Sequence, residues 1–141
     1  MSSGTDESRP VETGSRPVVD HVSGVAFAPT LERLVRAIET ADMTIFARID
    51  HAAGAREVGM EMPPTVVLLY GNPRGGTPIM LAAPQAALDL PLRVLVREAA
   101  DGRALVSFHP IVPLLRQAGV PDELAVRLEP AQRILIEAIQ A

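Results

Sequence analysis

Two runs of strand-forming residues in the second half of the chain are joined by a turn dipeptide. The runs cover residues 92–98 and 104–108, and Asp101-Gly102 lies between them. Asp-Gly flanked by such runs is typical of a tight hairpin, because the favoured turn needs a positive φ at its central residues. The sequence therefore predicts at least one antiparallel pair of strands, which excludes an all-parallel sheet.

The remaining segments do not repeat a strict strand–helix alternation. A helix is predicted over residues 28–41, since its apolar side chains recur at the spacing of one buried face. The continuous apolar run 65–70 is typical of a strand covered on both faces, and residues 43–50 alternate so that Ile45 and Ile49 are expected on one face. We further predict a strand over residues 18–25. Short helices are predicted over residues 52–58 and 111–117, and a third from Thr77-Pro78 to residue 82 or 83. Two more helices are expected to begin at Pro121 and at Pro130.

This element order predicts an α+β fold, with a mainly antiparallel sheet of about five strands and helices packed on one face. Residues 1–17 are rich in Ser, Gly, Pro and charge and contain almost no apolar side chains. Such a segment buries too little surface to offset the entropy lost on ordering, so a disordered tail is predicted there. Residues 18–141 are expected to form a single α+β domain.

The composition narrows the possible partners. The net charge is −4 and the 13 basic residues are dispersed, which argues against a nucleic-acid partner because phosphate binding needs clustered Lys and Arg. The absence of Cys excludes disulfides and thiolate nucleophiles. The apolar runs are far shorter than the roughly 20 residues of a membrane helix, so no membrane partner is predicted. No leader pattern is found, and a cytoplasmic location is expected.

Three polar islands interrupt the apolar runs, and the first is Asp50-His51, at the end of a predicted strand. A carboxylate that holds a neighbouring imidazole can support acid–base chemistry, which makes Asp50 and His51 the candidate catalytic residues. Alternatively, Asp50 caps the helix that follows and His51 is a surface residue.

The second island runs from Gly71 to Pro78 and reads Gly-Asn-Pro-Arg-Gly-Gly-Thr-Pro. Glycines let a backbone approach a ligand closely, and the helix expected at Thr77-Pro78 would offer free N–H groups to an anion. Arg74 adds a cation. The spacing matches neither a P-loop nor a dinucleotide fingerprint. The alternative is a tight turn from strand to helix, in which the glycines supply positive φ angles.

The third island is Leu88-Asp89-Leu90-Pro91. Its flanking leucines predict a buried carboxylate at Asp89, which then needs a partner such as Arg74, Arg93 or backbone N–H groups. The structural alternative is that Asp89 only locks the loop by accepting hydrogen bonds.

The histidines suggest no metal site. His21, His51 and His109 lack close ligand spacing, so no metal is predicted, and His109 before Pro110 is expected at the surface. No cofactor motif is found, and no cofactor is predicted.

In their order and spacing, the islands resemble the family catalogued as domain of unknown function number 302. The resemblance is carried by residues 44–56, Pro64-Thr65, 71–80 and 89–93. It covers residues 25–108 and is expected to fade before residue 18 and after Pro110. It implies a TATA-binding-protein-like order of one strand, one helix, four strands and a helix, with the short helices as insertions. The family has no established activity.

The leading hypothesis is a binding module in which all three islands line one pocket for a small polar or anionic molecule. One alternative is an enzyme that uses Asp50 and His51 for acid–base chemistry on that ligand. Another has no site: the islands are structural, and the apolar surface of the sheet forms a homodimer. The expected ligand-binding residues are Asp50, His51, Asn72, Arg74, Gly76, Thr77 and Asp89.

Overall fold

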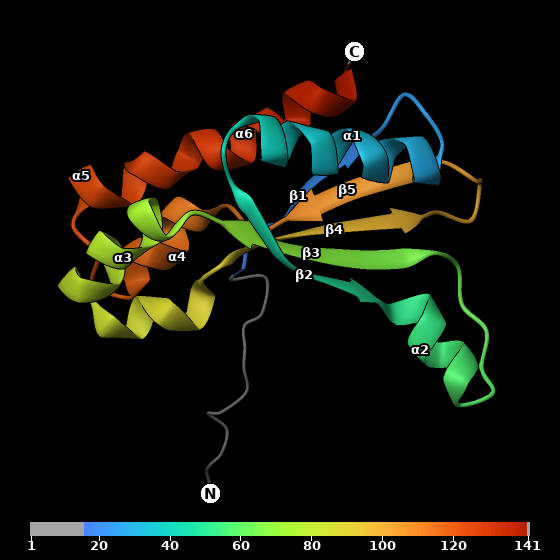
Figure 1. Ribbon diagram of the computed structural model, residues 1–141, viewed down its shortest axis with the longest axis horizontal. Coiled ribbons are helices and arrows are strands. Elements are labelled where there is room, and N and C mark those ends of the chain that lie inside the picture. Colours follow the sequence, from blue (N-terminus) through green and yellow to red (C-terminus); the bar gives the residue numbers. More distant parts are fainter. Residues whose placement is uncertain (1–15, 141) are drawn as a thin grey trace, which may run out of the picture.

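The computed structural model describes residues 16–140 (Figure 1). Five strands form one sheet in the order β1-β5-β4-β3-β2, and every neighbouring pair is antiparallel. The tail predicted for residues 1–17 lies outside the described residues except for Arg16 and Pro17. The strands are β1 (Val19–Val22), β2 (Thr44–Asp50), β3 (Thr65–Gly71), β4 (Leu92–Glu98) and β5 (Ala104–Phe108).

The two longest helices lie together over one face of this sheet, where α1 contacts α6, β4 and β5 (Figure 1). This arrangement confirms the predicted α+β class with an antiparallel sheet and helices on one face. The helices are α1 (Phe27–Thr40), α2 (His51–Glu57), α3 (Pro73–Ala82), η2 (Pro84–Asp89), α4 (Ile111–Gln117), α5 (Asp122–Ala125), η3 (Val126–Leu128) and α6 (Glu129–Gln140), the η elements being 3₁₀ helices.

The core lies between the helix layer and alternate residues of the strands. Val66, Leu68 and Tyr70 of β3 are buried on this face. Val67 and Leu69 between them are only half-buried, on the face that α1 and α6 do not cover. The prediction that residues 65–70 are covered on both faces is therefore wrong. We call this second face the open face. On it, Ile49, Val67 and Leu95 lie side by side on neighbouring strands, and Val22 lies beside Leu105.

A β-bulge changes the orientation of β2. Ile45 pairs with Tyr70, but the next paired residue is Ala47, which lies opposite Leu69. The extra residue, Phe46, shifts all later side chains to the opposite face. Ile45 and Ile49 consequently lie on different faces, against the predicted alternation. Phe46 and Ile49 are 51 % and 41 % exposed, so the bulge brings apolar side chains to the surface.

Candidate functional site

The first island has a structural role at one end of the sheet. The Asp50 carboxylate accepts a hydrogen bond from the Ala53 backbone N–H at 2.9 Å and caps α2. His51 is the first residue of that helix and is exposed. A hollow of about 190 Å³ lies beside Asp50, but His51 is not among the residues that line it. The geometry therefore matches the capping alternative.

The strand register separates this island from the second one. Asp50 lies opposite Val66, whereas Gly71 lies opposite Thr44 at the other end of the same strand pair. Asn72 follows Val66 by six residues, which corresponds to about 20 Å along a strand. The expected pocket that joins Asp50 and His51 to Asn72 and Thr77 is therefore not formed. We call the two ends of the sheet the α2 end and the cavity end.

The second island forms a helix earlier than the sequence suggested. Helix α3 begins at Pro73, and its N-cap is Asn72, whose side-chain oxygen accepts a hydrogen bond from the Arg74 N–H at 2.9 Å. The Asn72 amide nitrogen also donates to the Asp42 carbonyl at 3.3 Å. Asn72-Pro73 offers an N-cap residue followed by proline at the first helical position, as Thr77-Pro78 also does. Because Asn72-Pro73 comes earlier in the chain, the helix begins there. Pro78 therefore lies inside the helix.

The glycines of this island provide room rather than an unusual backbone conformation. The chain does pass tightly from β3 into α3 here, as the turn alternative expected, but among residues 16–140 the glycines with positive φ are Gly59, Gly102 and Gly119, so the expected positive φ angles at Gly71 to Gly76 are wrong. A methyl group placed on Gly76 would lie 3.8 Å from Leu90 and Met80, at ordinary contact distance. Side chains at these positions would occupy space that the glycines leave empty.

That space belongs to a cavity of about 440 Å³, which we call the motif cavity. The second and third islands meet there, since Asn72, Gly76 and Thr77 line it together with Leu90 and Pro91. Arg74 and Asp89 are not among its lining residues. The other residues around it are Met43, Phe46, Leu69, Gly71, Pro73, Gly75, Met80, Leu92, Leu128 and Ala131.

The lining of the motif cavity is chiefly apolar. Asn72 and Thr77 supply its polar side chains, and no charged side chain lines it within residues 16–140. Tyr70 fixes one wall, because its hydroxyl donates to the carbonyl of Ala131 at 2.9 Å. Burial raises the pKa of Tyr70 well above its ordinary value, so the hydroxyl stays protonated and remains a donor. The cavity is suited to a mostly apolar molecule.

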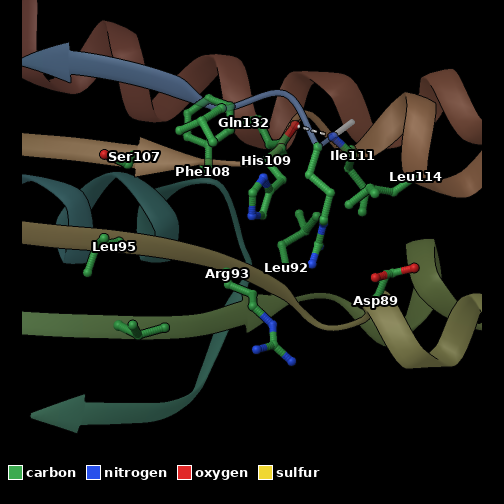
Figure 2. A pocket seen from close by; sticks show the side chains of 13 residues that line it. Asp89, Leu92, Arg93, Leu95, Ser107, Phe108, His109, Ile111, Leu114 and Gln132 are labelled. Atoms are coloured by element: carbon green, nitrogen blue, oxygen red, sulfur yellow. Dashed lines mark hydrogen bonds between the residues drawn. The ribbon is translucent and has the colours of Figure 1, made fainter. Parts of the chain in front are cut away.

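Asp89 lines a different pocket, of about 330 Å³, which we call the His109 pocket (Figure 2). Asp89 is half-buried rather than buried. Arg93 lines the same pocket, but no ion pair joins the two within the described part of the chain. The predicted partnership of Asp89 with Arg74 or Arg93 is therefore absent there. The pocket is also lined by Arg16, Val18, Val67, Leu92, Leu95, Ser107, Phe108, His109, Ile111, Leu114 and Gln132.

Sequence reasoning missed Gln132, which organises this pocket. The side chain is 6 % exposed; its oxygen accepts from the Ile111 N–H and its nitrogen donates to the His109 carbonyl, both at 2.9 Å. One signal was available, because Gln132 falls on the buried face of α6 with Leu135 and Ile139. A polar residue at a core position must find hydrogen-bond partners. His109, expected at the surface, is half-buried.

Two further observations concern metal-binding clusters and membrane-spanning helices. Among the described residues, no three His, Asp or Glu side chains gather as a metal site would require. Within the same residues, each helix is too short or too polar to cross a lipid bilayer.

The family model described as "Domain of unknown function DUF302" matches residues 19–141. The match continues through α4, α5 and α6, so the expectation that the resemblance fades after Pro110 is wrong. The fold resembles the crystal structure of the uncharacterized conserved protein DUF302 from Bacillus stearothermophilus, with a TM-score of 0.74. That likeness covers 87 % of this chain and 95 % of the other at 17 % identity, and therefore concerns the fold alone.

Two curated relatives are named fluoride-specific ion channel FluC 1, from Brucella suis biovar 1 (strain 1330) and Brucella abortus biovar 1 (strain 9-941). Each is 33 % identical to this chain over 102 residues, which is 71 % of the chain. The match accounts for 40 % and 38 % of the two relatives. The chain thus corresponds to about two fifths of the length of these relatives.

Proposed function

The chain belongs to the family described as domain of unknown function DUF302, and from that premise we propose that it is a binding module holding a small ligand in the motif cavity. One observation carries the proposal. Two sequence islands, 71–78 and 88–91, contribute residues to a single hollow. Its volume of about 440 Å³ falls within the range of small-molecule sites, roughly 300–1,000 Å³.

The lining favours a ligand that is mostly apolar and carries one hydrogen-bonding group. Apolar side chains from β2, β3, α3 and η3 surround the hollow. Of its two polar side chains, Asn72 already caps α3 and donates to the Asp42 carbonyl, whereas the Thr77 hydroxyl forms no hydrogen bond within residues 16–140 and is left for a ligand. The sequence alone suggested a polar or anionic molecule, because polar islands interrupt the apolar runs, the glycine loop offers N–H groups and Arg74 adds a cation. Its side chain is exposed and is not part of the lining.

A binding role has more support than catalysis by the first island. The Asp50 carboxylate is occupied as a helix cap, and the exposed His51 lines none of the three hollows described above. In the Brucella relatives, a comparable segment makes up about two fifths of a protein named for an ion channel. A module that binds a ligand on behalf of another part of the protein fits that arrangement.

The test uses cyclohexanol as a probe, because it combines an apolar ring with one hydroxyl. Binding is measured by NMR titration of the full chain. We expect saturable shifts of the backbone amides of Gly71, Gly75 and Gly76, and we expect Gly76→Leu to abolish them, since the new side chain would fill the hollow. Saturable binding that persists unchanged in Gly76→Leu, or shifts confined to the α2 end, would contradict the proposal.

Gly76→Ala separates ligand binding from stability. Alanine is favoured over glycine inside a helix by about 1 kcal/mol, and the added methyl meets its neighbours at 3.8 Å. The variant should therefore unfold at a higher temperature than wild type while binding the probe more weakly. Gly54→Ala in α2 is the matched control, because a methyl group there meets nothing within 4 Å. It should gain similar stability and leave probe binding unchanged.

A second candidate role is homodimer formation through the open face. Ile49 and Val22 are 41 % and 47 % exposed on this face, beside the half-buried Val67 and Leu105. Exposed apolar patches of this kind mark interaction surfaces. Sedimentation equilibrium should then show a dimer that Ile49→Glu dissociates. Val58→Glu, at a residue 72 % exposed but outside the sheet, should leave the dimer intact. A wild-type monomer at high concentration would count against this role.

A further inference from the structure

The His109 pocket offers a second site, distinct from the motif cavity. Within the described residues, the two share only Leu92 in their linings. The His109 pocket is formed by the segment before β1, β3, the end of η2, β4, the end of β5 with the residue after it, and the helices α4 and α6. Figure 2 shows three side chains around this hollow: Asp89 from η2, Arg93 from β4 and His109 from the link between β5 and α4.

The charge of this pocket is opposite in sign to that of the whole chain. The chain carries a net charge of −4, yet two arginines, Arg16 and Arg93, line the pocket against a single lining carboxylate, Asp89. Within residues 16–140, neither arginine forms an ion pair with an acidic side chain. Two guanidinium groups are therefore available to a ligand, and together they favour an anion.

The imidazole of His109 is held in one orientation. Its Nδ1 lies 2.8 Å from the carbonyl oxygen of Pro17. Because a carbonyl only accepts hydrogen bonds, Nδ1 carries the proton and Nε2 is left for other partners. The buried amide of Gln132 fixes the backbone here by its bonds to the His109 carbonyl and the Ile111 N–H. The ring is thus anchored through its own Nδ1 and through the backbone that carries it.

Apart from Ser107, whose hydroxyl donates to the Asp20 carboxylate, the rest of the pocket is apolar. Its floor and walls include Val67, Leu92, Leu95, Phe108, Ile111 and Leu114. A fully hydrated inorganic anion would gain nothing from these side chains, whereas a molecule with a hydrocarbon body would bury surface against them. The combination selects a ligand with one anionic head and a short apolar body.

We propose that the His109 pocket binds a small monocarboxylate with an apolar body. Arg93 and Arg16 pair with the carboxylate, Nε2 of His109 donates to it when the ring is protonated, and the hydrocarbon part packs on Leu92, Leu95 and Phe108. Asp89 opposes the bound anion, so it limits the affinity.

Isothermal titration of the full chain with benzoate tests this site. Benzamide, which keeps the ring but lacks the charge, and acetate, which keeps the charge but lacks the ring, should each bind about tenfold more weakly or worse. Arg93→Gln should weaken benzoate binding by about tenfold or more. Arg97→Gln is the matched control, because Arg97 lies on the same strand and face but does not line the pocket; it should leave the affinity unchanged.

Asp89→Asn should strengthen benzoate binding by about threefold, since it removes a like charge. Failure of benzoate to bind saturably, equal binding of benzamide, or an equal loss in Arg93→Gln and Arg97→Gln would each overturn the proposal. Gly76→Leu should abolish cyclohexanol binding without affecting benzoate. This variant therefore distinguishes failure of this site from failure of the motif cavity.

Discussion

The two ends of the sheet use polar side chains in different ways. At the α2 end, the bonds are local: Asp50 binds Ala53, Thr65 donates to the Pro63 carbonyl, and Asp101 binds Arg103. At the cavity end, Tyr70 reaches Ala131 across 61 residues of sequence, and Gln132 reaches Ile111 across 21. The motif cavity and the His109 pocket lie at the second end.

This difference separates residues that shape the backbone from residues that shape a site. A local bond satisfies a helix end or a turn and occupies the polar group that makes it, as for Asp50 and, at the cavity end, for Asn72. In the turn between β4 and β5, the hydrogen bond from the Arg103 backbone N–H is the main reason why the pKa of the Asp101 carboxyl lies below its usual range. Bonds between distant segments instead hold separate elements around a space. The largest consequences of mutation are therefore expected at the cavity end.

The largest effect is expected for Tyr70→Ala. The side chain is fully buried in the core, so its removal leaves a cavity and deprives the Ala131 carbonyl of its partner. We expect a loss of about 3–5 kcal/mol in the free energy of unfolding, measured by urea denaturation. Thr65→Ala, at the other end of the same strand, should cost less than about 1 kcal/mol. Equal losses would break the contrast between the two ends.

The next largest effect is expected for Gln132→Leu, which keeps the approximate volume but removes both hydrogen bonds. The Ile111 N–H and the His109 carbonyl are then left without their partner. We expect a loss of about 2–3 kcal/mol in unfolding free energy and weaker benzoate binding, because His109 is no longer anchored. Gln117→Leu, at an exposed position, is the control and should change neither quantity. Retention of wild-type stability would show that Gln132 is not an organising residue.

The sequence predicted well what local patterns determine. The strands β4 and β5 and the helix α4 have the predicted bounds, and α1 is displaced by only one residue. Gly59 follows α2 with φ of +79°, as expected of a glycine that ends a helix. These features depend on hydrophobic spacing and on turn or cap residues, all of which are visible within a few positions.

The site was predicted less well because it depends on pairing between distant segments. Asp50 and Asn72 both follow strand-like runs, and only the antiparallel register places them at opposite ends. The bulge at Phe46 gives no signal in an alternating sequence, yet it decides which apolar side chains reach the open face. The sequence hypothesis relied on the polar and charged side chains of the islands, whereas the motif cavity depends on the space left by the missing side chains of its glycines.

A smaller effect is expected at the α2 end for Asp50→Ala. Loss of the cap leaves the N–H of Ala53 without its acceptor, at a cost of about 1 kcal/mol. Asp50→Ser should recover most of this loss, since serine also caps helices, and His51→Ala should stay within about 0.5 kcal/mol of wild type. None of the three should alter the binding of cyclohexanol or benzoate in titrations. A change in either affinity would show that the α2 end influences binding at the cavity end, as the single-pocket hypothesis requires.

At neutral pH, an effect as small as that of Asp50→Ala is expected for Tyr70→Phe, which removes only the hydroxyl. Loss of its bond to Ala131 should cost about 1 kcal/mol. At alkaline pH, the difference in unfolding free energy between wild type and Tyr70→Phe changes sign. Burial raises the pKa of Tyr70 in the folded state, so the neutral side chain favours folding fully only below the unfolded pKa of about 10. Above that pH, the unfolded wild type releases a proton that the folded protein retains. Wild type then loses about 1.4 kcal/mol per pH unit relative to Tyr70→Phe.

The two stability curves should therefore cross at alkaline pH, which urea denaturation at several pH values would reveal. Tyr70 is the single tyrosine of the chain, so the absorbance of phenolate reports on it alone. In folded wild-type protein, this absorbance should appear only together with unfolding, as judged by circular dichroism. A phenolate signal near pH 10 in protein that remains folded would mean that the hydroxyl is reached by solvent. The wall of the motif cavity at Ala131 would then lack the buried anchor on which the contrast between the two ends depends.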